Sequence, residues 1–507
     1  MGRSRYFLWI FSLLLNRKNC IECKLVAEDD ILYGTFPEGF IWGVASSSYQ
    51  VEGGWDQGGK GLNNWDVWTQ DSESDHVSDK SNGQIAADSY HKYKEDVRLV
   101  ADMGVDVYRL SISWARIIPN GEGEVNPEGL LYYRSLFEEC IRQNITPMVT
   151  LSHFDMPYSL ESEQGGWLNP ESVEWFVNFA TVCFEEFADL VPLWITFNEP
   201  MQTVVGGWEN GNWPPGISSN KGRDLYVAAK NILLAHGRVY RLYEEMYKPL
   251  YGGKLGITLN TDWFEPLNED DPSHVAMAEQ SQQFRLGIWA SPIFQGDYPD
   301  VVKDVIGNRS QAQGFPTSRL PSLSVEEKEL LKGSADFFGL NMYTSDLVEP
   351  YDFPISEVSA AADNGAYYTK DENWYASGSF WLKVTPQGIR NTLNWIRLAY
   401  DNPPVIITEN GVSDNLGNLD DLQRIYYYKH YINNVLKAVK IDNCNVEGYV
   451  AWSLLDNFEW SFGYSMKFGL TRVDFNSPNR TRTPKESSKY IAKIANQNGF
   501  VESNVPC

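Results

Sequence analysis

The chain has 507 residues, of which 43% are hydrophobic and 14% aromatic, and its formal net charge at pH 7 is −25. A protein that binds nucleic acid presents a basic surface to the phosphates, so this charge argues against a nucleic-acid partner and against docking of a basic patch on an anionic membrane. Six cysteines do not make a disulfide scaffold in this length. Cys20-x-x-Cys23 has no second cysteine pair or histidine pair near it, so we expect no metal site.

Residues 1–23 have the pattern of a secretory signal peptide, although no clean small-x-small cleavage site follows. Arg3 and Arg5 precede the run 6–15, which is apolar except for one serine. This run is too short to span a bilayer, and no other stretch approaches that length. We therefore expect a protein that is secreted or lies in the secretory lumen, with no membrane span. Three N-glycosylation sequons fit a glycoprotein, and they begin at Asn144, Asn308 and Asn479.

Short apolar runs alternate along the chain with longer amphipathic segments. Eight runs are predicted strands: Phe40–Ser47, Asp106–Ser113, Thr146–His153, Leu193–Glu199, Lys254–Asn260, Asp336–Tyr343, Pro404–Glu409 and Glu447–Leu455. Six segments with apolar spacing near 3.6 are predicted helices: Tyr90–Met103, Gly129–Gln143, Ser172–Leu190, Asp224–Tyr247, Pro386–Tyr400 and Leu422–Ile441. Strands that are apolar on both faces and alternate with helices predict a single parallel (β/α)₈ barrel, a TIM barrel, over residues 30–500.

Two strand-to-helix connections are long, roughly 44–86 and 344–384, and they are rich in Gly, Asp, Asn and aromatic residues. In a barrel of this kind such connections lie at the catalytic end and shape the pocket. No Pro/Ser-rich linker divides the chain, which favours one domain.

Two of the predicted strands end on a glutamate, in Trp-Ile-Thr-Phe-Asn198-Glu199-Pro and Val-Ile-Ile-Thr-Glu409-Asn-Gly. A strand whose last residue is a glutamate points that side chain out of the end of the sheet. Two such strands of one barrel aim both carboxylates into one cleft. Two carboxyl groups on opposite sides of a cleft are the minimum that enzymatic cleavage of a glycosidic bond requires.

Polar and aromatic residues also stand at the ends of other predicted strands: Gln50, Arg109, His153, Asn198, Asn341, Tyr343 and Trp452, with Asp456, Glu459 and Trp460 just beyond. A capping or turn role explains any one of them. Polar groups are costly to bury unless they face a functional cavity, and seven of the eight strands carry them. The set therefore indicates a polar pocket at one end of the barrel.

The chain resembles glycoside hydrolase family 1, the β-glucosidase family, over about residues 36–495. Five strings in order carry the resemblance: Gly-Val-Ala-Ser-Ser-Ser-Tyr-Gln50-Val-Glu-Gly, Tyr-Arg109-Leu-Ser-Ile-Ser-Trp, Thr-Phe-Asn198-Glu199-Pro, Ile-Thr-Glu409-Asn-Gly and Trp452-Ser-Leu-Leu-Asp-Asn-Phe-Glu459-Trp460. The resemblance implies the same barrel fold. It also implies a retaining β-glucosidase that removes terminal non-reducing glucosyl residues, and often galactosyl or fucosyl residues, without metal or organic cofactor.

The resemblance implies a role for each matched residue. Glu409 is the expected nucleophile, kept ionised by Arg109 and Tyr343, and Glu199 is the expected acid/base, kept protonated by an apolar setting and the nearby charge. A retaining pair of carboxyl groups lies about 5–5.5 Å apart. The expected sugar contacts are hydrogen bonds from Gln50, His153, Asn198, Glu459 and Trp460, stacking on Trp452, and Trp381 at the entrance.

The string Ser-His153-Phe154-Asp-Met-Pro departs from the commonest family pattern, which has Trp in place of Phe154. Phe is also found there in the family's 6-phospho-β-glycosidases. Glu459, however, stands where the phosphate of such a substrate lies, and its negative charge repels a dianion. A phosphorylated substrate is therefore disfavoured.

Two further alternatives concern the reaction itself. Plant thioglucosidases (myrosinases) of the family carry Gln at the acid/base position, so Glu199 disfavours a plant-type myrosinase and leaves an insect-type myrosinase open. Family members of the klotho type are non-catalytic binding modules that have lost one catalytic glutamate, whereas this chain keeps both. The sequence does not identify the aglycone, nor does it distinguish a monomer from a homodimer.

Overall fold

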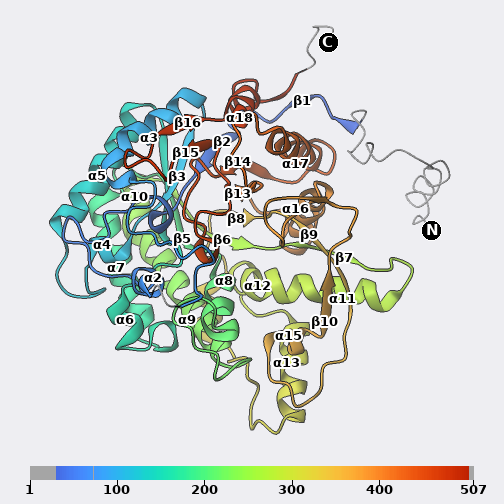
Figure 1. Cartoon of the computed structure of the whole chain (residues 1–507). Coiled ribbons are helices and arrows are strands. Elements are labelled where there is room, and N and C mark those ends of the chain that lie inside the picture. Colours follow the sequence, from blue (N-terminus) through green and yellow to red (C-terminus); the bar gives the residue numbers. More distant parts are fainter. Residues whose placement is uncertain (1–29, 72–73, 502–507) are drawn as a thin grey trace.

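The computed structural model describes residues 30–71 and 74–501, and a closed barrel of eight parallel strands lies at its centre (Figure 1). Around the barrel the strands follow in the order β13 (Val405–Asn410), β14 (Val446–Trp452), β2 (Ile41–Ala45), β3 (Val107–Ser111), β4 (Thr146–Ser152), β5 (Leu193–Asn198), β6 (Lys254–Asn260) and β8 (Phe338–Asn341). β8 pairs back onto β13 and closes the ring. Each of the eight predicted strands coincides with one of these within a few residues, so the predicted TIM barrel is confirmed.

The barrel strands are buried on both faces because helices cover the outside and side chains fill the inside. Every residue of β3, β5 and β13 is buried. A chain that alternates apolar and polar residues would leave one strand face polar, and these runs do not alternate. The long apolar runs of the sequence therefore become barrel strands, and polar residues are left for their ends.

The six predicted helices are confirmed in the outer layer: α3 (Ser89–Met103), α5 (Pro127–Arg142), α7 (Ser172–Phe187), α9 (Asp224–Leu242), α16 (Gln387–Ala399) and α17 (Leu422–Lys440). α3 ends at Gly104, whose φ of 67° is the left-handed conformation in which glycine stops a helix at little cost. The predicted helix over 224–247 continues past α9 as one π-helical turn, η4 (Tyr243–Tyr247).

Several helices lie outside the prediction: α11 (Pro272–Gln282), the π-helical turn η5 (Gln283–Gly287), α12 (Ile288–Gln295), α13 (Asp300–Ala312), α14 (Val325–Leu331) and α18 (Glu486–Asn496). α11 has no continuous apolar stripe, and α12 is apolar on most sides and contains Pro292. An apolar periodicity of 3.6 residues, the signal used for prediction, is therefore weak in both segments.

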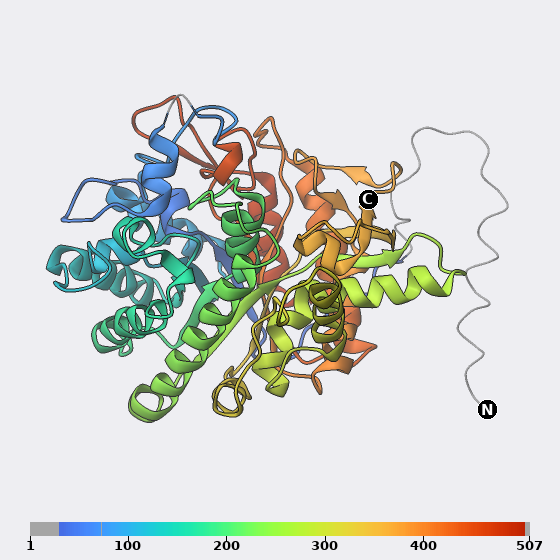
Figure 2. The same ribbon diagram turned by 90° about the horizontal axis from the view of Figure 1, so that it is seen from below.

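The two long connections contain short elements of their own. Residues 44–86 include α1 (Ser48–Val51) and α2 (Asn64–Gln70), and the 344–384 connection includes β9 (Ser345–Pro350), α15 (Ala360–Asn364), β10 (Ala366–Thr369), β11 (Tyr375–Ala376) and β12 (Lys383–Val384). β9 pairs with β7 (Trp263–Pro266) and β10 in a sheet outside the barrel. Figure 1 places this sheet beside α11, and Figure 2 shows the same side from below.

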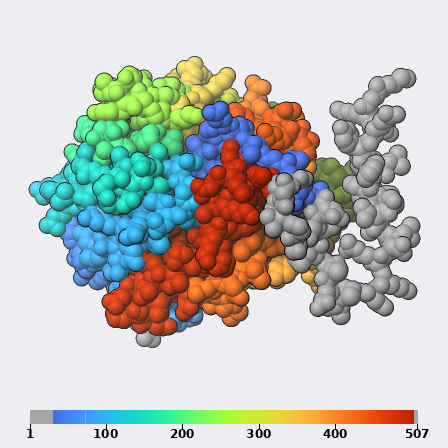
Figure 3. Space-filling model, turned by 90° about the horizontal axis from the view of Figure 1, so that it is seen from above, coloured from blue at the N-terminus to red at the C-terminus, as the bar shows by residue number. Residues whose placement is uncertain are grey.

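The remaining short elements lie in the connections between strands and helices: α4 (Trp114–Ile117), α6 (Tyr158–Ser162), η2 (Gly166–Leu168), α8 (Pro200–Val204), η3 (Val205–Asn210), α10 (Lys248–Tyr251), η6 (Trp460–Phe462), β15 (Thr471–Val473) and β16 (Arg482–Pro484). Near the two ends of the described chain, β1 (Gly34–Thr35) pairs antiparallel with β17 (Gly499–Phe500). Figure 3 shows these blue and red segments side by side on the surface.

The predicted signal peptide, Cys20 and Cys23 lie outside the described residues. Cys140, Cys183 and Cys444 are buried free thiols. No helix within residues 30–71 and 74–501 is long and apolar enough to cross a membrane.

Candidate active site

A cavity of about 520 Å³ opens at the carboxyl ends of the barrel strands, where the sequence predicts the pocket. Nine of the eleven predicted site residues line it: His153, Asn198, Glu199, Tyr343, Trp381, Glu409, Trp452, Glu459 and Trp460. The other two, Arg109 and Gln50, lie behind the lining and contact it. The barrel thus brings together side chains that are as far apart in the chain as Gln50 and Trp460.

Both glutamates that end a strand stand at irregular points of the barrel. The β5–β6 ladder shifts register between Ile195 and Asn198, and β13 shifts against both neighbours after Ile407. Such shifts re-aim the side chains that follow. Glu199 also has a φ of 44°, a left-handed conformation that is strained for a residue with a Cβ.

Glu409 accepts hydrogen bonds on both carboxylate oxygens. Arg109 Nη1 donates to Oε1, and the Tyr343 hydroxyl donates to Oε2 at 2.7 Å. The side chains of Arg109 and Glu409 are only 1% and 5% exposed, so water screens their ion pair little. This arrangement stabilises negative charge on Glu409.

Glu199 has a different environment. Burial, and next the charge of Glu409, raise the pKa of Glu199 from its ordinary value of 4.5 to about 8. Asn341 Nδ2 donates to Glu199 Oε1 at 2.7 Å, and this contact and the charge of Arg109 lower the pKa, but by less. Glu199 is therefore largely protonated at neutral pH. In contrast, Glu409 accepts hydrogen bonds from two donors, Arg109 and Tyr343.

Asn198 joins the two glutamates to His153. Its Oδ1 accepts from Arg109 Nη2 at 2.6 Å and from Asn341 Nδ2 at 3.1 Å, and its Nδ2 lies 3.2 Å from His153 Nε2. Burial, with the charge of Arg109 as a second cause, lowers the pKa of His153 well below 6.5. His153 is therefore neutral at physiological pH and offers the cavity no positive charge.

Glu459 is the third carboxyl group of the cavity. Its pKa is raised to about 8 by burial, and further by the charges of Glu409 and Glu199. Gln50 is buried behind it, and its Nε2 donates to Glu459 Oε2 at 3.2 Å and to the Phe458 carbonyl at 3.0 Å. The structure thus places Gln50 against Glu459, and its hydrogen bond to the sugar stays a prediction.

The sequence model of glycosyl hydrolase family 1 matches residues 32–500. The chain belongs to glycosyl hydrolase family 1. Its eight-stranded barrel is the fold of the structures that it matches.

Individual relatives agree with this family assignment. The chain is 43% identical over 479 residues to lactase/phlorizin hydrolase of Rattus norvegicus, a match that covers 94% of this chain and 25% of the relative's length. The structure of an aphid myrosinase matches with a TM-score of 0.88 and 42% identity, over 92% of this chain and 100% of that chain. A rice β-glucosidase mutant in a covalent complex with Glc matches with a TM-score of 0.86 and 36% identity, over 92% and 99% of the two chains.

Several residues line the cavity of this family 1 member without having been predicted as site residues: Gln202, Asn210, Asn212, Asp262, Arg285, Phe380 and Phe462. Asn341, noted in the sequence only as a strand end, contacts both Asn198 and Glu199. Asp262 follows the end of β6, so the strand-end rule could have found it. Arg285 lies on η5, in a region without a clear helical pattern, and nothing in the sequence marks it.

Phe154, the departure from the common family pattern, belongs to a second cluster of buried side chains. The cluster consists of Tyr49, Trp65, Val77, Phe154, Phe458 and Trp460. The Phe154 ring lies 5.0 Å from the Trp460 ring and 5.0 Å from the Trp213 ring. Phe154 therefore supports Trp460, a residue of the cavity wall, from the side.

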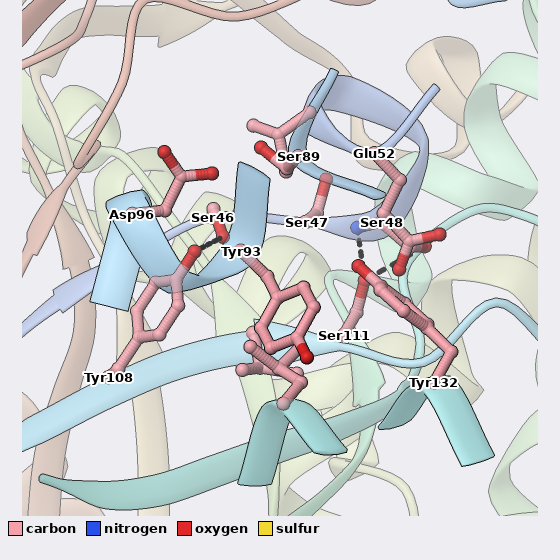
Figure 4. Close-up of a pocket in the computed structure, with 13 residues that line it drawn as sticks. Ser46, Ser47, Ser48, Glu52, Ser89, Tyr93, Asp96, Tyr108, Ser111 and Tyr132 are labelled. Atoms are coloured by element: carbon pink, nitrogen blue, oxygen red, sulfur yellow. Dashed lines mark hydrogen bonds between the residues drawn. The ribbon is translucent and has the colours of Figure 1, made fainter. Parts of the chain in front are cut away.

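A second cavity, shown in Figure 4, lies between β3, the segment 46–52 and the helices α3 and α5, and has a volume of about 20 Å³. The hydroxyls of Ser46 and Tyr108 are 2.6 Å apart on its wall, and Ser48 N donates to Ser111 Oγ at 2.7 Å. This volume accommodates a group about the size of one water molecule and is too small for a sugar ring. The large cavity is therefore the candidate substrate site.

Proposed function

We propose that this chain is a retaining β-glucosidase that hydrolyses terminal, non-reducing β-D-glucosyl residues by double displacement. The observation that carries the proposal is the contrast between two carboxyl groups of one cavity. Glu199 has a pKa raised to about 8, whereas Glu409 accepts hydrogen bonds from Arg109 and Tyr343. Two carboxyl groups whose environments differ in this way are an acid and a nucleophile.

In the first step Glu409 attacks the anomeric carbon, and the bond from this carbon to the aglycone oxygen breaks. The proton of Glu199 moves to the departing oxygen, and a glucosyl–Glu409 ester remains. In the second step Glu199, now ionised, accepts a proton from water while this water attacks the anomeric carbon. Glucose leaves, and both glutamates return to their starting states. The separation of about 5–5.5 Å between the two carboxyl groups stays a prediction.

The glucosyl unit is assigned to the part of the cavity between Glu409, Trp452 and Glu459. Trp452 offers a ring for stacking, and Asn198 and His153 offer hydrogen-bonding atoms next to the reacting centre. Gln50 acts through its contact with Glu459 in this proposal. Because Glu459 both donates and accepts when protonated, galactosyl and fucosyl units fit the proposal as further substrates.

The covalent complex of the rice β-glucosidase supports the double-displacement step, because a covalent bond to glucose is its intermediate. We also propose that the protein enters the secretory pathway and is glycosylated. The leader-like residues 1–23 support this, and the asparagines of the three sequons are exposed: Asn144, Asn308 and Asn479.

The test is hydrolysis of p-nitrophenyl β-glucoside by the full chain, beside the variants Glu409→Gln and Glu122→Gln. Glu409→Gln removes the nucleophile and should lower kcat by at least about a thousandfold. Glu122 is exposed and lies outside the cavity, so Glu122→Gln should behave as wild type. Lack of turnover by the folded wild type, or full activity of Glu409→Gln, would contradict the proposal.

A second candidate is a thioglucosidase, which the match to an aphid myrosinase favours. The substrate then carries a sulfur-linked aglycone with a sulfate group. A comparison of kcat/KM for the glucosinolate sinigrin and for p-nitrophenyl β-glucoside distinguishes the two candidate functions. Higher kcat/KM on sinigrin would replace the β-glucosidase with the thioglucosidase.

A further inference from the structure

One wall of the cavity carries a charged pair next to Glu199. Asp262 lies two residues beyond the end of β6, and Arg285 lies on η5. Both side chains line the same cavity as Glu199 and Glu409. Thr261, the residue before Asp262, donates its N–H to the carbonyl of Asn341, and the Asn341 side chain donates to Glu199. The pair therefore lies on the side of the acid/base, where the aglycone leaves.

The pair has unused hydrogen-bonding capacity. Arg285 Nη2 and Asp262 Oδ2 are 3.8 Å apart, which is longer than a hydrogen bond. Their side chains are 29% and 25% exposed, and within the described residues neither makes a side-chain hydrogen bond. A guanidinium group has five N–H donors and a carboxylate has two acceptor oxygens. Groups half-buried in a cavity with this capacity are available to a ligand.

A sugar hydroxyl matches such a pair because it accepts and donates hydrogen bonds at the same oxygen. Neighbouring hydroxyls of one sugar ring can accept from Arg285 and donate to Asp262. Neutral polar side chains line the same cavity and add to this capacity: Gln202, Asn210 and Asn212. An aglycone without hydroxyls leaves the pair unused.

The local charges disfavour an anionic aglycone. Arg285 is the only Lys or Arg among the described residues that line the cavity. It faces Asp262 and also Asp346, whose pKa is raised to about 6 by burial and by the charge of Asp262, and which pairs with Lys370 at 2.7 Å. Of these groups only Arg285 and Asp262 line the cavity, so a sulfate that contacts Arg285 also meets the carboxylate of Asp262.

Aromatic rings of the same cavity suit the apolar C–H faces of a sugar. The Phe380 and Phe462 rings lie 6.0 Å apart, and the Trp381 ring lies 5.8 Å from the Tyr343 ring. Phe380 is 79% exposed, so its ring is free to cover a group that extends from the cavity.

We infer that Arg285 and Asp262 are specificity-determining residues that hold the aglycone through its hydroxyl groups, and that the preferred aglycone is a neutral sugar. This inference rests on the proposed function, because it needs the glucosyl unit to lie at Glu409. It extends that function by naming the class of the leaving group, a β-linked disaccharide or oligosaccharide being the substrate.

The test compares kcat/KM for cellobiose with kcat/KM for p-nitrophenyl β-glucoside in the wild type, Arg285→Met and Asp262→Asn. Each variant removes a charged hydrogen-bonding partner of the sugar, so the cellobiose-to-aryl ratio should fall about ten- to a hundredfold. Arg238→Met is the matched control, because Arg238 is a half-exposed arginine that pairs with Glu174 away from the cavity, and it should leave the ratio unchanged. Circular dichroism checks that each variant folds.

Sinigrin is the third substrate, and the wild type should cleave it with a lower kcat/KM than cellobiose. Two results would overturn the inference: an unchanged cellobiose-to-aryl ratio in both folded variants, or a larger loss on sinigrin than on cellobiose in Arg285→Met. The second result would make Arg285 an anion site. Turnover of p-nitrophenyl β-glucoside by the wild type tests the proposed function separately. If the wild type hydrolyses this substrate and the cellobiose-to-aryl ratio is unchanged in both variants, only the role of Arg285 and Asp262 is refuted.

Discussion

Three carboxyl groups, Glu199, Glu409 and Glu459, face one cavity in three different environments. Glu409 accepts from a guanidinium and a phenol, Glu199 from one amide, and Glu459 from the amide of Gln50. Burial raises the pKa of both Glu199 and Glu459 to about 8. The pocket thus contains two largely protonated acids and a third carboxyl group, Glu409, that accepts hydrogen bonds from a guanidinium and a phenol.

Replacement of Glu199 should change how stability depends on pH. Because the pKa of Glu199 is raised from 4.5 to about 8 by folding, its stabilising contribution is full below about pH 4.5 and is lost as pH rises toward 8. Glu199→Gln does not ionise, so its Tm relative to wild type should rise by a few degrees between pH 5 and pH 8. Calorimetry at both pH values measures this, with Glu122→Gln as the exposed control. A difference that stays constant with pH would contradict the raised pKa.

Removal of the Tyr343 hydroxyl should slow the chemical step. Tyr343→Phe takes away the hydrogen bond that Glu409 Oε2 accepts at 2.7 Å, so kcat on p-nitrophenyl β-glucoside should fall about ten- to a hundredfold. Tyr108→Phe is the control, because its hydroxyl contacts Ser46 at the small cavity of Figure 4. Equal kcat values for the two variants would exclude a role of the Tyr343 hydroxyl in orienting Glu409.

At the scale of elements, the site is built where regular structure ends. The register shifts of β5 and β13 stand directly before the two glutamates. Three residues of the cavity wall, Phe154, Glu199 and Trp460, have positive φ values of 72°, 44° and 48°. Strain of this kind persists only where surrounding packing holds it, and here the strand ends and the aromatic cluster around Trp460 hold it.

The aromatic cluster can be tested at Phe154. Phe154→Ala should lower the free energy of unfolding by about 3 kcal/mol, since it leaves a cavity beside the rings of Trp460 and Trp213, and it should raise KM by loosening Trp460. Urea unfolding and aryl-glucoside kinetics measure the two effects. Leu250→Ala is the control, because Leu250 is 72% exposed, and it should cost less than about 0.5 kcal/mol. Wild-type stability in Phe154→Ala would mean that the cluster does not support the site.

The strand-end residues and the outer helices could be predicted because their signals are local. A run such as Val405–Asn410 shows both its burial and the polar residue at its end. Arg285 could not be predicted, because it reaches the cavity through the position of η5, which follows a helix without an apolar stripe. The contacts of Gln50 with Phe458 and Glu459 could not be predicted either, because they depend on the fold of the connection from β14.

At the scale of the whole molecule, the barrel is a frame that fixes distant residues at one end. Gln50 and Glu459 are hydrogen-bonded, and so are Arg109 and Glu409. The family match covers residues 32–500, nearly all of the described chain. The sequence pattern was sufficient to predict this barrel, because eight apolar strands that alternate with helices are typical of a closed (β/α)₈ barrel. The connections, whose conformation depends on contacts between them, carry the residues that we propose to select the aglycone.

The central claim is that Glu409 forms a covalent bond to glucose, and trapping this intermediate tests it most directly. The full chain is incubated with 2,4-dinitrophenyl 2-deoxy-2-fluoro-β-glucoside, in which the fluorine slows breakdown of the intermediate and the good leaving group allows it to form. Peptide mass spectrometry should find one 2-deoxy-2-fluoroglucosyl group, on the peptide that contains Glu409. An adduct on another residue, or no adduct in a preparation that turns over p-nitrophenyl β-glucoside, would contradict the account.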